Sequence, residues 1–296
     1  MKSYLQYIKE LVKTDWLRYY NAGLIELPEI PEGIRELNCE ANELISLPKL
    51  PDSLEVLECR GNNLTSLPKL PKLLKKLECQ ENDLSELPEL PDSLEVLRCE
   101  NNNKISSLPQ LPESLKVLWC WSNKLKSLPK LPSMLEELYC QMSLILELPE
   151  LPDSIYHLNC TQNKLTILPQ LPKSLIHLEC SRNKLTFLLR LPDDIKYLEC
   201  EYNKLTKLPE LPQSLEKLKC YNNPLKCLIP TKFIKNQDRE WMKKYYFPMI
   251  NSYEGQKNIL SDNILNLEEL IKQTNGHIDP MIKLEFKDII KQSEWS

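Results

Sequence analysis

The stretch "LEVLECRGNNLTSLPKLPKL", residues 54 to 73, is one copy of a pattern that recurs along most of the chain. Its cysteine returns every 20 residues, with one interval of 21, at Cys39, Cys59, Cys79, Cys99, Cys120, Cys140, Cys160, Cys180, Cys200 and Cys220. A fixed period of this length is typical of stacked repeats, in which each copy forms one coil and neighbouring coils share a continuous core. The sequence therefore predicts a solenoid rather than a small fold held together by disulfides.

The unit reads L-x-x-L-x-C-x-x-N-x-L-x-x-L-P-x-L-P-x-S, and its constant positions have distinct physical roles. The apolar positions are expected to point inward and to stack on their equivalents one coil away; in the quoted copy they are Leu54, Leu57, Cys59, Leu64, Leu67 and Leu70. The asparagine three residues after the cysteine is expected to satisfy backbone groups of its own and neighbouring coils. Ser143 replaces it in one copy.

The L-P-x-L-P segment accounts for a composition of 23 proline and 5 glycine residues. Proline restricts φ and lacks an N–H group, so two prolines three residues apart favour an extended, polyproline-like return rather than a helix. Each coil is therefore expected to contain a strand, a turn and an extended back. Leu189 replaces the first proline of its copy, and one extra residue lies between 100 and 104.

The run "LPKLPDSLEVLECRGNNLTSLPKLP" resembles the leucine-rich repeats of the short bacterial type, which carry the same L-P-x-L-P signature. Those repeats occur in effectors of the Yersinia outer protein M and invasion plasmid antigen H kind, and similar repeats are expected in large viruses of amoebae. The resemblance implies a right-handed α/β leucine-rich-repeat solenoid with a parallel β-sheet on its concave face and helical caps at both ends. Cysteine is a departure, because those families usually place an aliphatic residue at this strand position.

Three regions are expected along the chain. Residues 1–24 are predicted to form an N-terminal helical cap, because apolar residues through Trp16 and Tyr20 follow nearly helical spacing. Residues 25–229 hold ten repeats of about 20 residues. Residues 230–296 are predicted to form a C-terminal helical cap or a small helical domain, with helices over 237–246, 262–273 and 281–292. Such caps cover the apolar edges that a solenoid exposes at its ends.

The regular cysteines could form disulfides, bind zinc or fill small positions in the core. Equivalent cysteines on parallel strands have parallel Cβ vectors, which disfavours a bridge, and a line of thiols does not surround a zinc ion. We therefore expect buried free thiols and neither a metal nor another cofactor. His157 and His177 lie on the opposite face from the cysteines, where they are interpreted as part of an exposed row or as a partner contact rather than as a metal site.

No catalytic residue is expected. In proteins of the invasion plasmid antigen H kind, a ubiquitin-ligase domain with a catalytic cysteine follows the repeats. Here Cys227 is the one cysteine beyond the regular series, and the roughly seventy residues that follow the repeats are too few for that domain. Five glycines in all argue against a glycine-rich phosphate loop.

Charge and hydropathy limit the expected partners and compartment. The net charge of −4 with mixed signs argues against duplex nucleic acid as a partner. The sequence contains neither a secretory apolar region at its start nor a run of about 18 apolar residues, so no membrane association is expected. Ten free thiols favour a reducing compartment, which predicts a cytoplasmic location that includes the cytosol of a host cell.

Strand alternation assigns a second set of side chains to the concave face. In the middle of the arc this face carries an aromatic cluster with a polar rim, which is the composition of an interaction hot spot. The candidate partner-binding residues are Val117, Trp119, Trp121, Glu137, Tyr139, His157, His177, Tyr197 and Tyr221. The alternative is that the aromatic side chains only stabilise the sheet by packing across its strands.

The leading hypothesis is a non-enzymatic module of the effector type that binds a partner protein on its concave face. A second hypothesis is a targeting subunit, in which the repeats hold a client and the C-terminal helices recruit an enzyme. A third places an enzymatic activity in residues 230–296.

Overall fold

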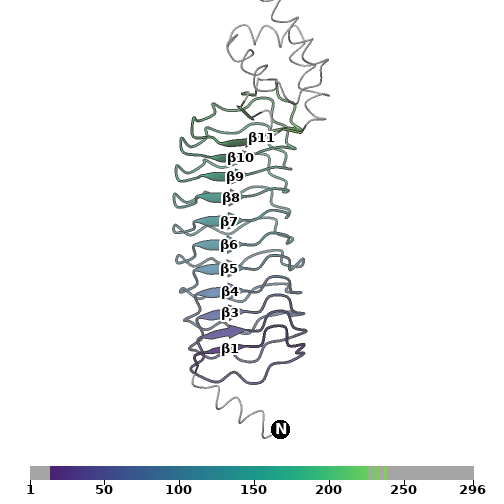
Figure 1. The fold of residues 1–296 in the computed structure, drawn as a ribbon, viewed down its shortest axis with the longest axis vertical. Helices are drawn as coiled ribbons and strands as arrows, with labels where there is room; N and C mark the ends of the chain where they lie inside the picture. The colour runs from purple at the N-terminus through teal and green to yellow at the C-terminus, as the bar shows by residue number, and fades with distance from the viewer. Residues whose placement is uncertain (1–13, 227–228, 231, 234–236, 239–296) are drawn as a thin grey trace, which may run out of the picture.

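A computed structural model describes residues 14–226, 229–230, 232–233 and 237–238 of the chain. In it, eleven short parallel strands form one sheet in strict chain order, with one strand in each coil (Figure 1). The strands are β1 (Trp16–Arg18), β2 (Glu36–Asn38), β3 (Val56–Glu58), β4 (Lys76–Glu78), β5 (Val96–Arg98), β6 (Val117–Trp119), β7 (Glu137–Tyr139), β8 (His157–Asn159), β9 (His177–Glu179), β10 (Tyr197–Glu199) and β11 (Lys217–Lys219). The L-P-x-L-P segments contain neither helix nor strand, as the prolines predict. The parallel solenoid expected from the sequence is therefore confirmed.

The core runs through the inside of every coil as columns of equivalent residues. The middle residue of each strand points inward, as Leu57 does, and the ladder cysteine two residues later, such as Cys59, is likewise buried. The register pairs each strand with the same positions of the next, so that Leu57 aligns with Leu37 and Leu77. All ten ladder cysteines are buried free thiols, as expected.

Asparagine side chains join each coil to the one before it. The amide nitrogen of Asn62 donates to the carbonyl oxygens of Cys39, at 3.0 Å, and Cys59, at 3.1 Å. Its side-chain oxygen accepts a hydrogen bond of 3.1 Å from the backbone N–H of Leu44. Buried backbone groups at the turn thus find partners that an apolar residue could not supply. We call this repeated set of bonds the asparagine ladder.

The residue before the ladder asparagine, or before Ala22 and Ser143 where the asparagine is replaced, has a left-handed backbone conformation. Gly61 occupies this position with φ of 63°, but ten other coils place a different residue type there, with φ between 50° and 56°. These are Asn21, Ala41, Glu81, Asn101, Ser122, Met142, Gln162, Arg182, Tyr202 and Asn222. A left-handed conformation costs a residue with a Cβ roughly 1–2 kcal/mol. The turn is therefore imposed by the contacts between coils rather than by local preference.

The sequence predicts a helical cap over residues 1–24, and this prediction is wrong for residues 14–24, which form a further coil of the solenoid. Trp16–Arg18 forms β1, which pairs in register with β2, and Leu17 is buried in the core. Tyr19 takes the place of the cysteine and Ala22 that of the asparagine, so the two marker residues of the pattern are missing from this coil. The expected helix over residues 1–13 lies outside the described residues.

Residues beyond the last repeat cover the open end of the core. Phe233 is buried, and the side chain of Gln237 accepts a hydrogen bond of 2.9 Å from the N–H of Cys220 and donates one of 2.7 Å to the carbonyl of Leu218. Gln237 thereby satisfies backbone groups that a twelfth coil would otherwise pair. The helices expected within 239–296 lie outside the described residues.

The asparagine ladder has two consecutive defects near its middle. The extra residue of the fifth coil falls between Asn102 and Ile105, where Asn103 has φ of 57°, and the side-chain oxygen of Asn123 in the next coil is buried without a hydrogen-bond partner. One coil further on, Ser143 reaches only the carbonyl oxygen of Asn123, at 3.5 Å. These two coils are thus held together by fewer hydrogen bonds than their neighbours.

Restoring the ladder should stabilise the protein. We expect Ser143→Asn to raise the free energy of unfolding by about 1 kcal/mol, because the new amide regains hydrogen bonds to buried backbone groups. The matched reverse change, Asn163→Ser, should lower it by about 1–3 kcal/mol. Chemical denaturation followed by circular dichroism measures both. Equal stabilities of the three proteins would contradict the role assigned to the ladder.

Candidate binding surface

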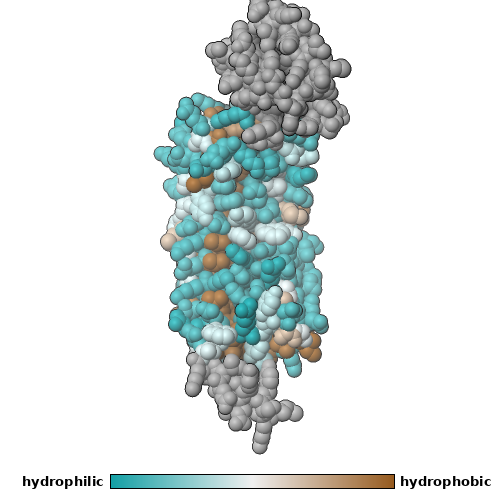
Figure 2. Space-filling view, in the orientation of Figure 1, coloured by the Kyte–Doolittle hydropathy of each residue, from teal (hydrophilic) through white to brown (hydrophobic). Residues whose placement is uncertain are grey.

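The outward-facing residues of the strands line one side of the solenoid, which we call the strand face. In the orientation of Figure 1 the molecular surface is mostly hydrophilic, with small separate apolar patches (Figure 2). The strand face has two parts with different chemistry. A polar part covers β2 to β5, and an aromatic part covers β6 to β10.

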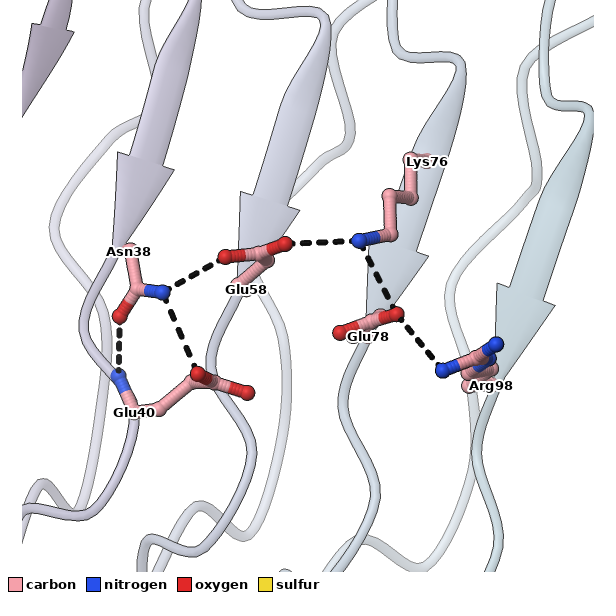
Figure 3. A network of polar contacts seen from close by, with 6 residues as sticks. All are labelled: Asn38, Glu40, Glu58, Lys76, Glu78 and Arg98. Atoms are coloured by element: carbon pink, nitrogen blue, oxygen red, sulfur yellow. Dashed lines mark hydrogen bonds and ion pairs between the residues drawn. The ribbon is translucent and has the colours of Figure 1, made fainter. Parts of the chain in front are cut away.

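Charged and polar side chains of the first part form a continuous network (Figure 3). The amide of Asn38 donates to Glu58 at 2.6 Å, and Glu58 pairs with Lys76 at 2.7 Å. Lys76 also lies 3.1 Å from Glu78, which in turn pairs with Arg98 at 3.2 Å. Three of these links join neighbouring strands and the Lys76–Glu78 pair lies within β4, so these charges are largely compensated within the protein.

Arg98 connects the polar part to the aromatic part. Its guanidinium lies over the Trp119 ring, 4.0 Å from the ring centroid, which is a cation–π contact. From Trp119 a column of rings continues along the sheet. The centroid separations are 4.9 Å for Trp119–Tyr139, 4.6 Å for Tyr139–His157, 4.9 Å for His157–His177 and 4.2 Å for His177–Tyr197.

We call the five rings of Trp119, Tyr139, His157, His177 and Tyr197 the ring column. From β6 to β10 the column crosses from one side of the strand face to the other. Trp119 and Tyr139 are the last residues of β6 and β7, whereas His157, His177 and Tyr197 are the first residues of β8, β9 and β10. All five residues are half-buried, so each packs against its neighbours in the column and keeps part of its surface in contact with solvent. The structure thus brings five of the predicted residues into one contiguous surface.

Hydrogen bonds fix the orientation of the rings. The carboxylate of Glu137 accepts from the Trp119 indole N–H at 3.4 Å and from the Tyr156 hydroxyl. The Tyr139 hydroxyl is within hydrogen-bond distance of Nδ1 of His157, at 3.2 Å. Nε2 of His157 lies 3.4 Å from Glu179 but makes no hydrogen bond. Sequence reasoning missed Tyr156, because it precedes β8 and strand alternation does not assign it to this face.

The surroundings of Tyr139, Tyr156 and His177 favour the uncharged forms of these three side chains. Burial raises the pKa of Tyr139 to about 12, and the hydrogen bond to Glu137 raises the pKa of Tyr156 to about 12. Burial, followed by the charge of His157, lowers the pKa of His177. At neutral pH the two hydroxyl groups therefore remain protonated and available as hydrogen-bond donors.

The remaining predicted residues lie beside the ring column or apart from it. Val117 is half-buried at the start of β6, next to Glu137 in the register. Trp121 follows β6 and is half-buried, outside the column. Tyr221 lies near the end of the solenoid and contacts Tyr202 edge-on, with centroids 5.6 Å apart. The central surface is therefore formed by the ring column with Val117, Glu137 and Trp121.

A row of buried polar residues runs along the ends of the strands. Glu100, immediately after the ladder cysteine of its coil, is only 5% exposed, and one of its carboxylate oxygens has no hydrogen-bond partner. Burial is the main reason why the pKa of Glu100 is raised to about 7. Glu201 holds the equivalent position in β10's coil, and burial raises its pKa as well.

A reactive thiol and a metal centre are two kinds of chemical site that the described residues allow us to test. Burial raises the pKa of the Cys39 and Cys140 thiols to about 12, so a thiolate nucleophile is disfavoured there. No group of three or more His, Cys, Asp or Glu side chains in the described part of the chain could hold a metal ion. Within the same residues, no helix is long and apolar enough to cross a membrane.

Comparisons with solved structures identify the relatives of this solenoid. The leucine-rich effector protein YopM from Yersinia pestis is 31% identical over 77% of this chain and 83% of its own, with a TM-score of 0.51. The chain belongs to the bacterial leucine-rich-repeat family of YopM. YopM from Yersinia enterocolitica is 32% identical over 76% of this chain, with a TM-score of 0.50. This leucine-rich-repeat chain spans 64% of the length of that relative.

A more distant leucine-rich-repeat structure shares the unusual cysteine column. InlJ from Listeria monocytogenes, whose functional domain includes a cysteine ladder, is 23% identical over 76% of this chain and 62% of its own, with a TM-score of 0.60. At this identity the similarity shows the fold alone. No protein-family model matches the sequence, and no curated protein matches it at a significant level.

The buried carboxyl of Glu100 should make stability depend on pH. Because its pKa is raised in the folded state, the stability that it contributes is full below about pH 4.5 and is lost as the pH rises through about 7. We expect Glu100→Gln to increase the free energy of unfolding by about 1–3 kcal/mol at about pH 8, and by little at about pH 5. Denaturation at both pH values measures this difference, with Glu86→Gln on the exposed return as the control. An equal gain at both pH values would contradict the burial of the charge.

The ladder thiols should be unreactive in the folded protein. In a Cys227→Ser variant, we expect no rapid reaction with the thiol reagent DTNB under native conditions. The reason is that all ten ladder cysteines are buried and the reagent cannot reach them. After denaturation in guanidinium, all ten should react. A ladder thiol that reacted in native buffer as fast as free cysteine would overturn this assignment.

Proposed function

We propose that this leucine-rich-repeat protein is a non-enzymatic module that binds a partner protein through the ring column and the residues beside it. The single observation that carries this proposal is the continuous column of rings from Trp119 to Tyr197, whose residues are only half-buried. Half-buried Trp and Tyr side chains held by a rigid sheet offer large contact area with little loss of conformational entropy.

The distribution of charge supports a binding role for the aromatic part in particular. The polar part compensates its own charges through the network from Asn38 to Arg98, so it gains little from a partner's charges. The aromatic part instead presents indole and imidazole edges with the Tyr139 hydroxyl. Stacking between strands alone would stabilise the sheet by about 0.2–1 kcal/mol per pair, and the tryptophan variants described below separate this role from partner binding.

The family suggests the biological setting of this interaction. The Yersinia pestis relative is a leucine-rich effector protein. By analogy, we propose that this chain acts as an effector in a cytosol, including that of a host cell. The buried thiols of the cysteine ladder are compatible with such a reducing compartment.

A targeting subunit is the second candidate function. It would use the same strand face for its client and residues 239–296 to recruit an enzyme. Removing residues 239–296 leaves Phe233 and Gln237, which cover the last coil, in place. If the enzyme but not the client is lost from the complex with this truncated chain, the second candidate is favoured over the first.

The proposed surface is tested by substituting its tryptophans. We expect Trp119→Ala and Trp121→Ala each to weaken binding about tenfold or more, because a hot-spot tryptophan contributes at least about 1–2 kcal/mol. Partners are first recovered from candidate host cytosol by quantitative affinity purification. Their dissociation constants for each variant are then measured by calorimetry.

The matched control is Leu73→Ala, which removes an exposed apolar side chain from the turn before β4, in a coil that does not contribute to the ring column. It should bind as the wild type does. Circular dichroism and thermal unfolding must show that all variants are folded. If both tryptophan variants bind every recovered partner with wild-type affinity, the ring column is only a packing feature and the proposal fails.

A further inference from the structure

A second apolar surface lies on the turns that follow the strands, away from the ring column. It consists of five exposed side chains from three consecutive coils, Met142, Leu144, Leu146, Ile167 and Phe187, and we call it the edge cluster. Leu146 is 59% exposed and Ile167 is 45% exposed. Because these side chains point out of the coils, they do not serve the core. An exposed group of this kind marks an interaction surface more often than a packing requirement.

The edge cluster departs from the residue types that the repeat uses elsewhere. Four residues after the ladder cysteine, the coils of β6, β8, β9 and β10 carry the exposed lysines Lys124, Lys164, Lys184 and Lys204. Leu144 takes this position in the coil of β7, between Lys124 and Lys164. Leu146 likewise stands where the neighbouring coils have Lys126 and Thr166. The fold accepts a polar residue at both positions, so it does not explain the leucines.

Backbone hydrogen bonds place Leu144 and the lysines at the same position of successive coils. The N–H of Leu144 donates to the carbonyl of Leu125 at 2.9 Å, and the N–H of Lys164 donates to that of Ile145 at 2.9 Å. Lys184 and Lys204 make the same bond to the coil before them, both at 2.8 Å. Successive turns are therefore one coil apart, about 4.8 Å, which side chains of this length span easily.

The lysines around the cluster have no acidic partner in the structure. Within residues 14–226, Lys124, Lys126, Lys164, Lys184 and Lys204 form no ion pair at 4.0 Å or less. This contrasts with the strand face, where Lys76, Lys217 and Lys219 all pair with glutamates. Glu147 is an acidic neighbour of the cluster, but the lysines outnumber it.

We propose that the edge cluster is a second docking site, which binds an acidic segment of a partner protein that carries apolar side chains. The leucines, Ile167 and Phe187 would bury the apolar side chains of this segment, and the flanking lysines would pair with its Asp and Glu residues. Opposite charge at the rim and apolar contact at the centre together provide both affinity and selection of the partner. This site is independent of the ring column, because it lies on other residues of the coil.

A phage-displayed library of random peptides tests the proposal without knowledge of the partner. We expect selection on the wild-type protein to enrich peptides in which Asp or Glu flank apolar residues. The enriched peptides should bind about tenfold more weakly to Leu144→Lys/Leu146→Thr, because burying a leucine side chain is worth about 1.5–3 kcal/mol. Both replacements use residue types found at the equivalent positions of neighbouring coils, so this variant should fold.

Two further variants separate the parts of the proposal. The double variant Lys164→Glu/Lys184→Glu should bind the same peptides more weakly at low ionic strength. The variant Trp119→Ala should bind them with wild-type affinity. Fluorescence anisotropy measures each affinity. If the enriched peptides are no more acidic than the library, or bind the leucine variant equally well, the proposal is overturned.

The same variants also test two alternative occupants of the edge cluster, an anionic membrane and a second copy of the chain. Vesicles of phosphatidylserine and phosphatidylcholine test an anionic membrane surface, and analytical ultracentrifugation tests a second copy of the chain. Binding to vesicles without peptide enrichment, or a dimer that Leu144→Lys/Leu146→Thr dissociates, would replace the proposed partner and overturn the proposal. Loss of peptide binding in Trp119→Ala would instead show that the edge cluster is not a separate site.

Discussion

The hydrogen bonds of the asparagine side chains are the constraint on which the rest of the solenoid depends. Each coil must reverse the chain direction after a strand of only three residues, which leaves buried backbone groups without strand partners. The amide of Asn62 meets this need in two coils at once, by donating to Cys39 and Cys59 and accepting from Leu44. The residue before this position is left-handed in all eleven coils, and it is a glycine in only one of them. Hydrogen bonding between coils therefore outweighs the local conformational preference of the residues in the turn.

The strand face shows how a repeated backbone can carry a graded surface. Because the register never changes, equivalent side chains form columns, and the residue types along a column determine its chemistry. From Asn38 to Arg98 the columns form ion pairs, and from Trp119 to Tyr197 they form a stack of rings. Arg98 belongs to both parts, since it pairs with Glu78 and covers Trp119. The two parts are thus joined through a cation that satisfies a carboxylate on one side and an aromatic face on the other.

Most of the fold could be predicted from the sequence, because leucine, cysteine and asparagine recur at fixed intervals that only a stacked parallel sheet explains. The coil of β1 could not, because Tyr19 and Ala22 replace the two residues that mark the period. Alternation within the strands predicted that Trp119, Tyr139, His157, His177 and Tyr197 lie on the strand face, and the structure places them there. It did not indicate that the stack would cross from the last to the first strand position, nor that Tyr156 would join it through Glu137. The edge cluster was missed because exposure on an irregular turn follows no simple period.

The extra residue near Asn103 has a consequence for how such proteins change in length. It is absorbed entirely within one turn, because β5 and β6 still pair in register, with Val96 opposite Val117. A change in one turn therefore does not propagate to the strands, and each coil behaves as an interchangeable unit. Adding or removing one complete coil would move everything beyond it by a single step of about 4.8 Å along the solenoid axis. The number of coils between two surfaces of the solenoid therefore sets the distance between them.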